Sequence, residues 1–302
     1  MEIEEGRRRK SPVREMLFVT ELYLPESDEP HRSLETYLDH GRFLVAAGAP
    51  LRVHTSPDLA ETLQKSWEGL STDHVELRTD VLAEPYWQLS VRLPRQGNEA
   101  KDTAFFLSVQ LSKLKLCALA AESSDYVAWV DYAVFHVLKD VEASQKNLRS
   151  VAHRLPESGR TRLLSPTAWA QGEYELWHVP CWRHLGGFLM GSGSAFVKAY
   201  DKQLKLVAAG LPILTWEINY WAMMDGEFDG YRADHDDSLI GNALTMLSPC
   251  ADGSQTPPNS LHAELKEPAF SVPNGQEEVD GGLPDASSEA VLDALVVQVE
   301  GG

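Results

Sequence analysis

The sequence is poor in cysteine and in basic residues, and both shortages narrow what the protein can be. Its 302 residues hold three cysteines, Cys117, Cys181 and Cys250, an odd number without CxxC spacing. Such a set fits neither a disulfide framework nor a thiolate zinc site, so we expect a reducing, cytoplasmic location. With 27 Lys and Arg against 45 Asp and Glu, the net charge is −18. A field of that sign repels polyanions, so we expect no nucleic-acid partner.

Long apolar runs are missing as well. No stretch of 18 apolar residues occurs, and the basic cluster at 7–10 is not followed by the apolar stretch of a signal peptide. We therefore expect no transmembrane segment and no export signal. Strict catalytic signatures are also lacking: there is no P-loop lysine, no GxSxG elbow and no HExxH pair.

The composition that is present is that of a globular protein, with 43% hydrophobic and 24% charged residues. The length suits one α/β domain of about 200–250 residues with tails. We predict a flexible charged arm at 1–15, a folded domain at 16–248 and a disordered acidic tail at 249–302, with a possible short helix at 287–299. Residues 251–302 contain ten Asp or Glu and one Lys, together with many Pro, Gly and Ser.

Hydrophobic periodicity predicts alternating strands and helices in the first half of the domain. The expected strands lie near 16–20, 51–55, 74–78 and 125–135, and the expected helices near 34–48, 57–67 and 103–122. Such alternation indicates a mostly parallel sheet, in which ligands bind beyond the carboxyl ends of the strands. In the second half we expect strands and loops over 168–194, a helix over 194–210 and the start of another at 215.

Asp131 ends the apolar strand pattern YVAWVDYAVFH, where a carboxylate can meet a cation or a phosphate. An ordinary turn-capping Asp is the alternative. A second polar cluster, YRADHDDSLIGNAL at 231–244, offers His235 and several carboxylates as metal ligands. Acidic residues that favour a helix N-terminus explain the same cluster without a metal.

Glu217, in TWEINYWAMMD, stands among aromatic residues at the start of a predicted helix. A carboxylate in such surroundings suits a general base, and the rings suit sugar stacking, although a solvent-facing Glu is the simpler interpretation. Lys113 and Lys115 are two residues apart on a helix, so only one of them can face a ligand phosphate.

These segments occur in an order that resembles the bacterial YibB/HtrL-type proteins, a family similar to GT-A fold glycosyltransferases. The segments are FVT, SKLKLCALAA, WVDYAVFH, LGGFLMGSGSAFVKAY, LTWEINYWA and YRADHDDSLIGN, within residues 16–245. The resemblance implies a GT-A-like, Rossmann-type α/β fold with a mixed, mostly parallel sheet flanked by helices. It also implies a transferase that moves a sugar from a nucleotide-sugar donor to a glycan or other hydroxyl acceptor.

The resemblance further implies a divalent cation, Mn²⁺ or Mg²⁺, that bridges the donor diphosphate. Asp131 would be the metal-binding Asp and His235 would complete the site. The family's usual Asp-x-Asp motif is incomplete here, because Trp129 and Ala133 occupy the neighbouring alternate positions.

The remaining implied roles concern the donor and the acceptor. Thr20 would lie at the nucleotide end of the first strand, Lys113 would meet the diphosphate, and Gly186 and Gly187 would admit the donor sugar. On the acceptor side, the base or orienting residue would be Glu217, and the sugar-stacking rings would be Trp216 and Trp221.

Two other functions remain open at this stage. The incomplete Asp-x-Asp motif favours a non-catalytic nucleotide-binding or interaction protein on the same fold. A metallohydrolase built on Asp131, His235 and Asp236 would need a further ligand, and none stands at a diagnostic spacing.

Overall fold

The computed structural model describes residues 15–25, 32–80, 82, 85–94, 101–155, 161–168 and 176–249, all within one compact unit that spans Met1–Cys250. The predicted arm and tail, with the helix predicted at 287–299, lie outside these ranges except for Glu15 and Pro249. Within the described ranges, no helix is both long and apolar enough to cross a membrane.

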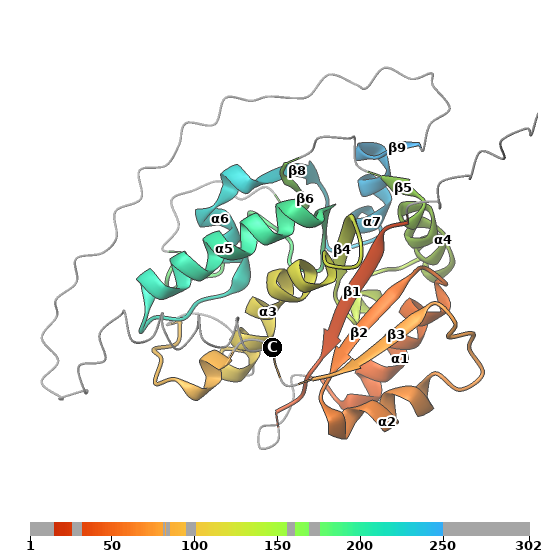
Figure 1. Ribbon diagram of the computed structural model, residues 1–302, viewed down its shortest axis with the longest axis horizontal. Coiled ribbons are helices and arrows are strands. Elements are labelled where there is room, and N and C mark those ends of the chain that lie inside the picture. Colours follow the sequence, from red (N-terminus) through yellow and green to blue (C-terminus); the bar gives the residue numbers. More distant parts are fainter. Residues whose placement is uncertain are drawn as a thin grey trace, which may run out of the picture. The chain divides into compact units, whose positions relative to one another are not determined.

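A seven-stranded sheet forms the centre of this part of the chain, in the strand order β3-β2-β1-β4-β7-β6-β8 (Figure 1). The strands are β1 Leu17–Leu22, β2 Leu51–Thr55, β3 Val75–Thr79, β4 Tyr126–Val130, β6 Leu163–Thr167, β7 Phe188–Ser192 and β8 Phe228–Arg232. A separate two-stranded ladder joins β5 Arg154–Leu155 to β9 Ser248–Pro249.

Most neighbouring strands of the large sheet are parallel. β3, β2, β1 and β4 run in one direction, and β6 pairs parallel with β8. β7 is the exception, because it runs antiparallel to both β4 and β6. The prediction of an α/β domain with a mixed, mostly parallel sheet is therefore confirmed.

The helices are α1 Leu34–Ala46, α2 Pro57–Ser66, α3 Ala104–Ala120, α4 Val141–Ala152, α5 Gly193–Gly210, α6 Glu217–Met223 and α7 Ser238–Gly241. Local sequence fixes several of their starts. The side chains of Ser33, Thr103 and Ser192 each accept a hydrogen bond from a backbone N–H three residues on, which caps α1, α3 and α5. Pro57 opens α2, where its missing N–H costs no helical hydrogen bond.

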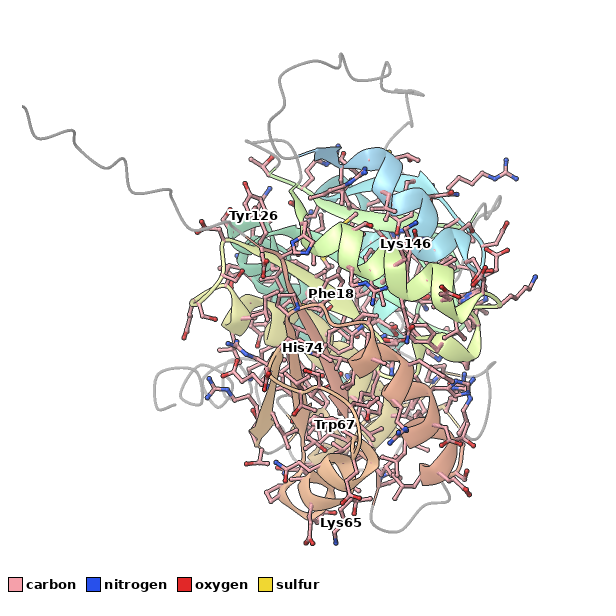
Figure 2. The ribbon with its side chains drawn as sticks, turned by 90° about the vertical axis from the view of Figure 1, so that its right-hand side faces the viewer. Phe18, Lys65, Trp67, His74, Tyr126 and Lys146 are labelled. Carbon is pink, nitrogen blue, oxygen red and sulfur yellow. The ribbon has the colours of Figure 1, made fainter. Side chains whose placement is uncertain are left out.

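The helices cover both faces of the sheet. α1, α2 and α4 contribute to one apolar cluster with side chains of alternate strand positions such as Phe18 and Val53. α3 contacts β1 and β4 and lies beside α5 (Figure 1). Figure 2 shows Phe18 inside the domain, whereas Lys65 of α2 and Lys146 of α4 point outward. α2 and α4 thus each bury one face and expose the other to water.

Sequence periodicity located the first half of the fold correctly but not all of the second. The expected strands and helices of the first half are present, but the strand predicted over 125–135 ends at Val130, and Val134–His136 form a 3-10 turn instead. The helix over 194–210 and the one that begins near 215 are present as well. α4 was not predicted. In the aromatic segment 168–194, the described residues 176–187 form no strand and β7 begins only at Phe188.

We expect Gly41→Ala to lower the free energy of unfolding by about 1–3 kcal/mol. A Cβ at Gly41, on α1, would collide with the ring of Tyr132, which is held by a 3.2 Å hydrogen bond from Trp67 Nε1 to its hydroxyl. This overlap outweighs the gain of about 1 kcal/mol that alanine gives in a helix. Urea denaturation would measure the change. Gly226→Ala is the control, since nothing lies within 4 Å of its Cβ position, and equal losses in both variants would contradict the argument.

Candidate functional site

A cavity of about 650 Å³ opens where β1 and β4 end, and we call it the central cavity. Its wall includes residues from several parts of the chain that the sequence analysis had singled out. They are Lys113, Asp131, Gly186, Gly187, Trp216, Glu217 and His235. The rule that ligands meet a parallel sheet at the carboxyl ends of its strands predicts this location.

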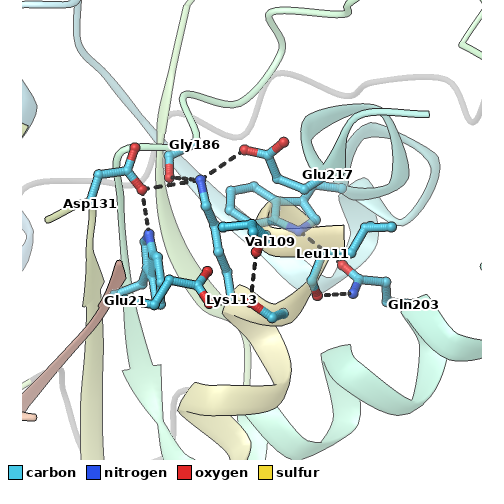
Figure 3. A network of polar contacts seen from close by, with 11 residues as sticks. Glu21, Val109, Leu111, Lys113, Asp131, Gly186, Gln203 and Glu217 are labelled. Atoms are coloured by element: carbon cyan, nitrogen blue, oxygen red, sulfur yellow. Dashed lines mark hydrogen bonds and ion pairs between the residues drawn. The ribbon is translucent and has the colours of Figure 1, made fainter. Parts of the chain in front are cut away.

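Lys113 is the centre of the site, and each of its three ammonium hydrogens has an acceptor. Nζ lies 2.9 Å from Glu217 Oε1, 3.1 Å from Asp131 Oδ1 and 3.0 Å from the carbonyl oxygen of Gly186 (Figure 3). The side chain is only 1% exposed. Lys113 therefore holds two carboxylates in place, and it has no hydrogen left for a diphosphate, which is the role we had expected for it.

The charge of Lys113 is stabilised by its neighbours. Burial by itself would lower the pKa of the amine, but the carboxylates of Asp131 and Glu217 outweigh that effect and raise the pKa above its ordinary value. The Trp129 ring adds a cation–π contact, with Nζ 5.6 Å from the ring centre. Lys113 is therefore a buried, charged ammonium group between the carboxylates of Asp131 and Glu217.

Asp131 directly follows β4, and among the described residues the hydrogen bonds to its carboxylate all involve Oδ1. Oδ1 accepts hydrogen bonds from Trp129 Nε1 at 2.8 Å and from Lys113. Its backbone N–H donates to the carbonyl of Gly187 at 3.0 Å. The side chain is 36% exposed, so Oδ2 is accessible from the cavity. An Asp fixed through one oxygen can present the other to a ligand.

Gly186 and Gly187 differ in whether the surrounding atoms leave room for a side chain. A Cβ at Gly186 would collide with Glu217 Oε1 and would stand 3.2 Å from Lys113 Nζ. A Cβ at Gly187 would find Asp131 Oδ2 at 3.7 Å, an ordinary contact. Glycine at 186 is thus a condition for the ion pair, whereas at 187 it leaves backbone close to the free oxygen of Asp131.

Glu21, which the sequence analysis missed, brings a third carboxyl group to the cavity. Its Oε2 accepts a 2.5 Å hydrogen bond from Ser112, and its Oε1 is buried without a partner among the described residues. Burial raises the pKa of Glu21 well above its ordinary value, which favours the neutral acid. Its neighbour Thr20, the predicted nucleotide contact, is fully buried and lies outside the cavity wall.

Two further cations of the cavity were also missed. Arg32, just before α1, and Lys101, just before α3, both line it. Burial lowers the pKa of Lys101, and the charge of Arg32 lowers it further. The two side chains therefore influence one another and create a positive region that suits phosphate oxygens. No spacing rule connects 32 with 101, since only the fold joins them.

The tryptophans that line the cavity are not all the ones predicted. Trp216 is 7% exposed and lines the cavity, and its predicted role toward the acceptor stays a prediction. Trp221 is fully buried, donates from Nε1 to Gln203 Oε1 at 3.3 Å and packs against Phe228, so its ring belongs to the core and is not available to a sugar. Trp182, which was not predicted, is 50% exposed and lines the cavity.

The acidic cluster near His235 does not act as one group. Asp236 accepts hydrogen bonds from the backbone N–H and hydroxyl of Ser238, and Asp237 accepts from the backbone N–H groups of Lys139 and Asp140. These carboxylates cap and connect segments. In the described part of the chain, no three His, Cys, Asp or Glu side chains are placed to hold a metal, so the metallohydrolase set does not form there.

Asp131 and His235 fit a divalent cation only if most of its ligands come from elsewhere. Both line the cavity, and the Asp131 charge counteracts the burial that lowers the pKa of His235. Mg²⁺ and similar ions are often held by one or two protein ligands together with substrate phosphates and water. Oδ2 of Asp131 and the imidazole are suited to that limited role.

We expect Lys113→Met to lower the free energy of unfolding by about 3–5 kcal/mol, because it leaves buried Glu217 without its counter-charge. Urea denaturation would measure the loss. Lys65→Met is the control: Lys65 pairs with Glu61 on the exposed face of α2, a pair worth only about 0.3–0.5 kcal/mol. Similar losses in the two variants would mean that the buried pair has no special role.

Gly186→Ala and Gly187→Ala form a matched pair. The first displaces Glu217 Oε1 from Lys113, so we expect a loss of about 1.5–3 kcal/mol, the range for a hydrogen bond to a charged group. The second meets only ordinary contacts and gains from a less flexible unfolded chain, so it should be neutral or slightly stabilising. Thermal unfolding of both variants would measure the difference, and a larger loss of stability in Gly187→Ala than in Gly186→Ala would contradict the prediction.

Comparisons with known proteins give structural similarity only. No family model matches the chain, and no curated protein matches it. A crystal structure of mouse xyloside xylosyltransferase 1 in its apo form is similar with a TM-score of 0.39 at 8% identity, over 72% of this chain and 85% of that one. A cytidylyltransferase from Leptospira borgpetersenii is similar with a TM-score of 0.38 at 10% identity, over 73% and 77%. Both TM-scores are below 0.5, so the function has to be inferred from the residues of the site.

Proposed function

We propose that the chain is a glycosyltransferase that uses a nucleotide-sugar donor and a glycan or other hydroxyl acceptor. The observation that carries this proposal is the pair of carboxylates, Asp131 and Glu217, held apart by one buried lysine on the wall of a cavity at the strand ends. Two carboxylates in different places can have different roles: Asp131 can act at the donor phosphates, and Glu217 can act at the acceptor hydroxyl.

The donor diphosphate is assigned to the region of Arg32, Lys101 and Asp131. Arg32 and Lys101 supply positive charge for phosphate oxygens. Asp131 Oδ2 and His235 would hold Mn²⁺ or Mg²⁺ against the same oxygens. When bound, the cation would neutralise the negative charge that develops on the departing diphosphate. The donor sugar is assigned to the backbone at Gly187, where no side chain intrudes, because the space beside Gly186 is taken by Glu217 Oε1.

Glu217 is assigned to the acceptor. Lys113 holds its Oε1, which leaves Oε2 to take the proton of the acceptor hydroxyl. The acceptor oxygen forms a bond to the anomeric carbon while the bond from that carbon to the diphosphate oxygen breaks. The nucleoside diphosphate leaves with the bonding electron pair, so charge and atoms balance.

A thermal-shift screen of UDP-, GDP-, CMP- and dTDP-sugars, with and without Mn²⁺, tests the donor assignment. We expect one nucleotide class to raise the melting temperature of the wild type in an Mn²⁺-dependent way, and Asp131→Asn to lose that shift. Asp58→Asn, which removes a negative charge from the exposed start of α2, should keep it. No shift with any donor would favour a non-catalytic protein on the same fold.

Turnover separates the enzyme from a nucleotide-binding protein. With the donor found in the screen, Glu217→Gln should keep the thermal shift, because the amide retains an oxygen for Lys113, but it should reduce sugar transfer by about 10²–10⁴-fold, the contribution of a general base. Release of nucleoside diphosphate in the presence of an acceptor measures the rate. A full rate in Glu217→Gln would remove the catalytic assignment.

A further inference from the structure

Trp182 stands out among the aromatic residues of the central cavity because half of its surface is exposed. A large apolar ring that stays in water gives up the stabilisation that burial provides, which is about 25 cal/mol for each Å². Trp216, on the same cavity, is 7% exposed, and Trp129 is 1% exposed. Packing therefore accounts for those two rings but not for the exposure of Trp182.

The residues on both sides of Trp182 are held by hydrogen bonds of their backbone or side chains. Before it, the N–H of Cys181 donates to Asn219 Oδ1 at 2.6 Å. After it, Arg183 binds both carboxylate oxygens of Asp225, at 3.1 and 3.3 Å. Buried His184 then lies 3.0 Å from the hydroxyl of Ser165, and the N–H of Leu185 donates to Pro166 at 2.9 Å.

The exposed ring is therefore on a fixed support. Cys181 is anchored to α6, Arg183 to Asp225, and both His184 and Leu185 to β6, while the Trp182 ring stays half exposed. Prior ordering of this kind reduces the entropy that a ligand must overcome when it binds. An aromatic side chain that is anchored through its neighbours and left uncovered has the properties of a binding surface.

A polar group lies at the edge of this ring. The His235 imidazole meets the Trp182 indole in an edge-to-face arrangement, with ring centres 5.5 Å apart and planes at 83°. His235 also lines the cavity, as does Glu217. One ligand can therefore contact an apolar face together with hydrogen-bonding groups.

We propose that Trp182 and His235 form the acceptor platform of the cavity, and that the acceptor is an uncharged sugar ring. This proposal rests on the proposed function. A pyranose has an apolar C–H face that covers an indole, and its rim of hydroxyls can meet a carboxylate such as Glu217. His235, which is assigned to the cation, contributes to the platform through its contact with the edge of the indole. The acceptor is assigned as uncharged because the indole offers an apolar face and no charge, and the cations Arg32 and Lys101 of the cavity wall are assigned to the donor phosphates.

Saturation-transfer NMR on the full chain tests the platform with a defined set of probes. The probes are the methyl glycosides of glucose, galactose and xylose, with glycerol and benzyl alcohol as hydroxyl compounds that lack a sugar ring. Spectra are recorded without nucleotide and again with the nucleotide identified by the thermal-shift screen. We expect wild-type protein to transfer saturation to the C–H protons of one face of at least one glycoside.

Trp182→Ala should weaken the binding of that glycoside by about fivefold or more, because roughly 1 kcal/mol of contact with the ring is lost. Trp182→Leu, which keeps an apolar side chain, should lose binding as well and provides a second test if the alanine variant unfolds. Leu119→Ala is the control, because Leu119 is 44% exposed on α3 and lies outside the cavity wall. It should bind like the wild type.

Equal glycoside binding in the wild type and in both Trp182 variants would overturn the platform, as would absence of glycoside binding to the wild type. Preference for benzyl alcohol over every glycoside would overturn the sugar assignment. If nucleotides bind but glycosides do not, the platform fails while the proposed function stands. If Trp182-dependent glycoside binding occurs without any nucleotide binding, the platform stands and the transferase assignment fails.

Discussion

The buried ammonium group of Lys113 is the interaction on which the site depends. A charge removed from water is costly unless it is fully paired, and Lys113 meets this condition through two carboxylates and one carbonyl. These partners come from α6, from the end of β4 and from the segment before β7. The requirement to pair one cation therefore brings separate segments together and fixes the positions of Asp131 and Glu217.

The reversed direction of β7 makes this arrangement possible. Because β7 runs antiparallel to β4, its first residue, Phe188, pairs with the last residue of β4, Val130. Gly186 and Gly187 then lie beside Asp131, and their carbonyl groups accept from Lys113 and from the Asp131 backbone. A parallel strand would have brought its carboxyl end to this edge instead. The change of direction thus supplies a glycine-rich backbone where the ligand would bind.

Much of the fold could be predicted because local patterns determine it. Apolar runs marked β1, β2 and β4, and the long helical pattern over 103–122 marked α3. The place of Asp131 at the end of a buried strand followed from the same reasoning, and so did the helix start at Glu217. Such features depend on residues close in sequence, where backbone hydrogen bonding and side-chain periodicity act directly.

The sequence by itself determined the alternation of elements and the presence of acids and aromatic residues near strand and helix ends. Only the tertiary structure decided what each side chain does. It buried Trp221, left Trp182 exposed, and added Glu21, Arg32 and Lys101 to the cavity. It also used all three hydrogens of Lys113 internally. Exposure and charge pairing depend on neighbours that are distant along the chain, and a periodic pattern holds no information about which distant residues will meet.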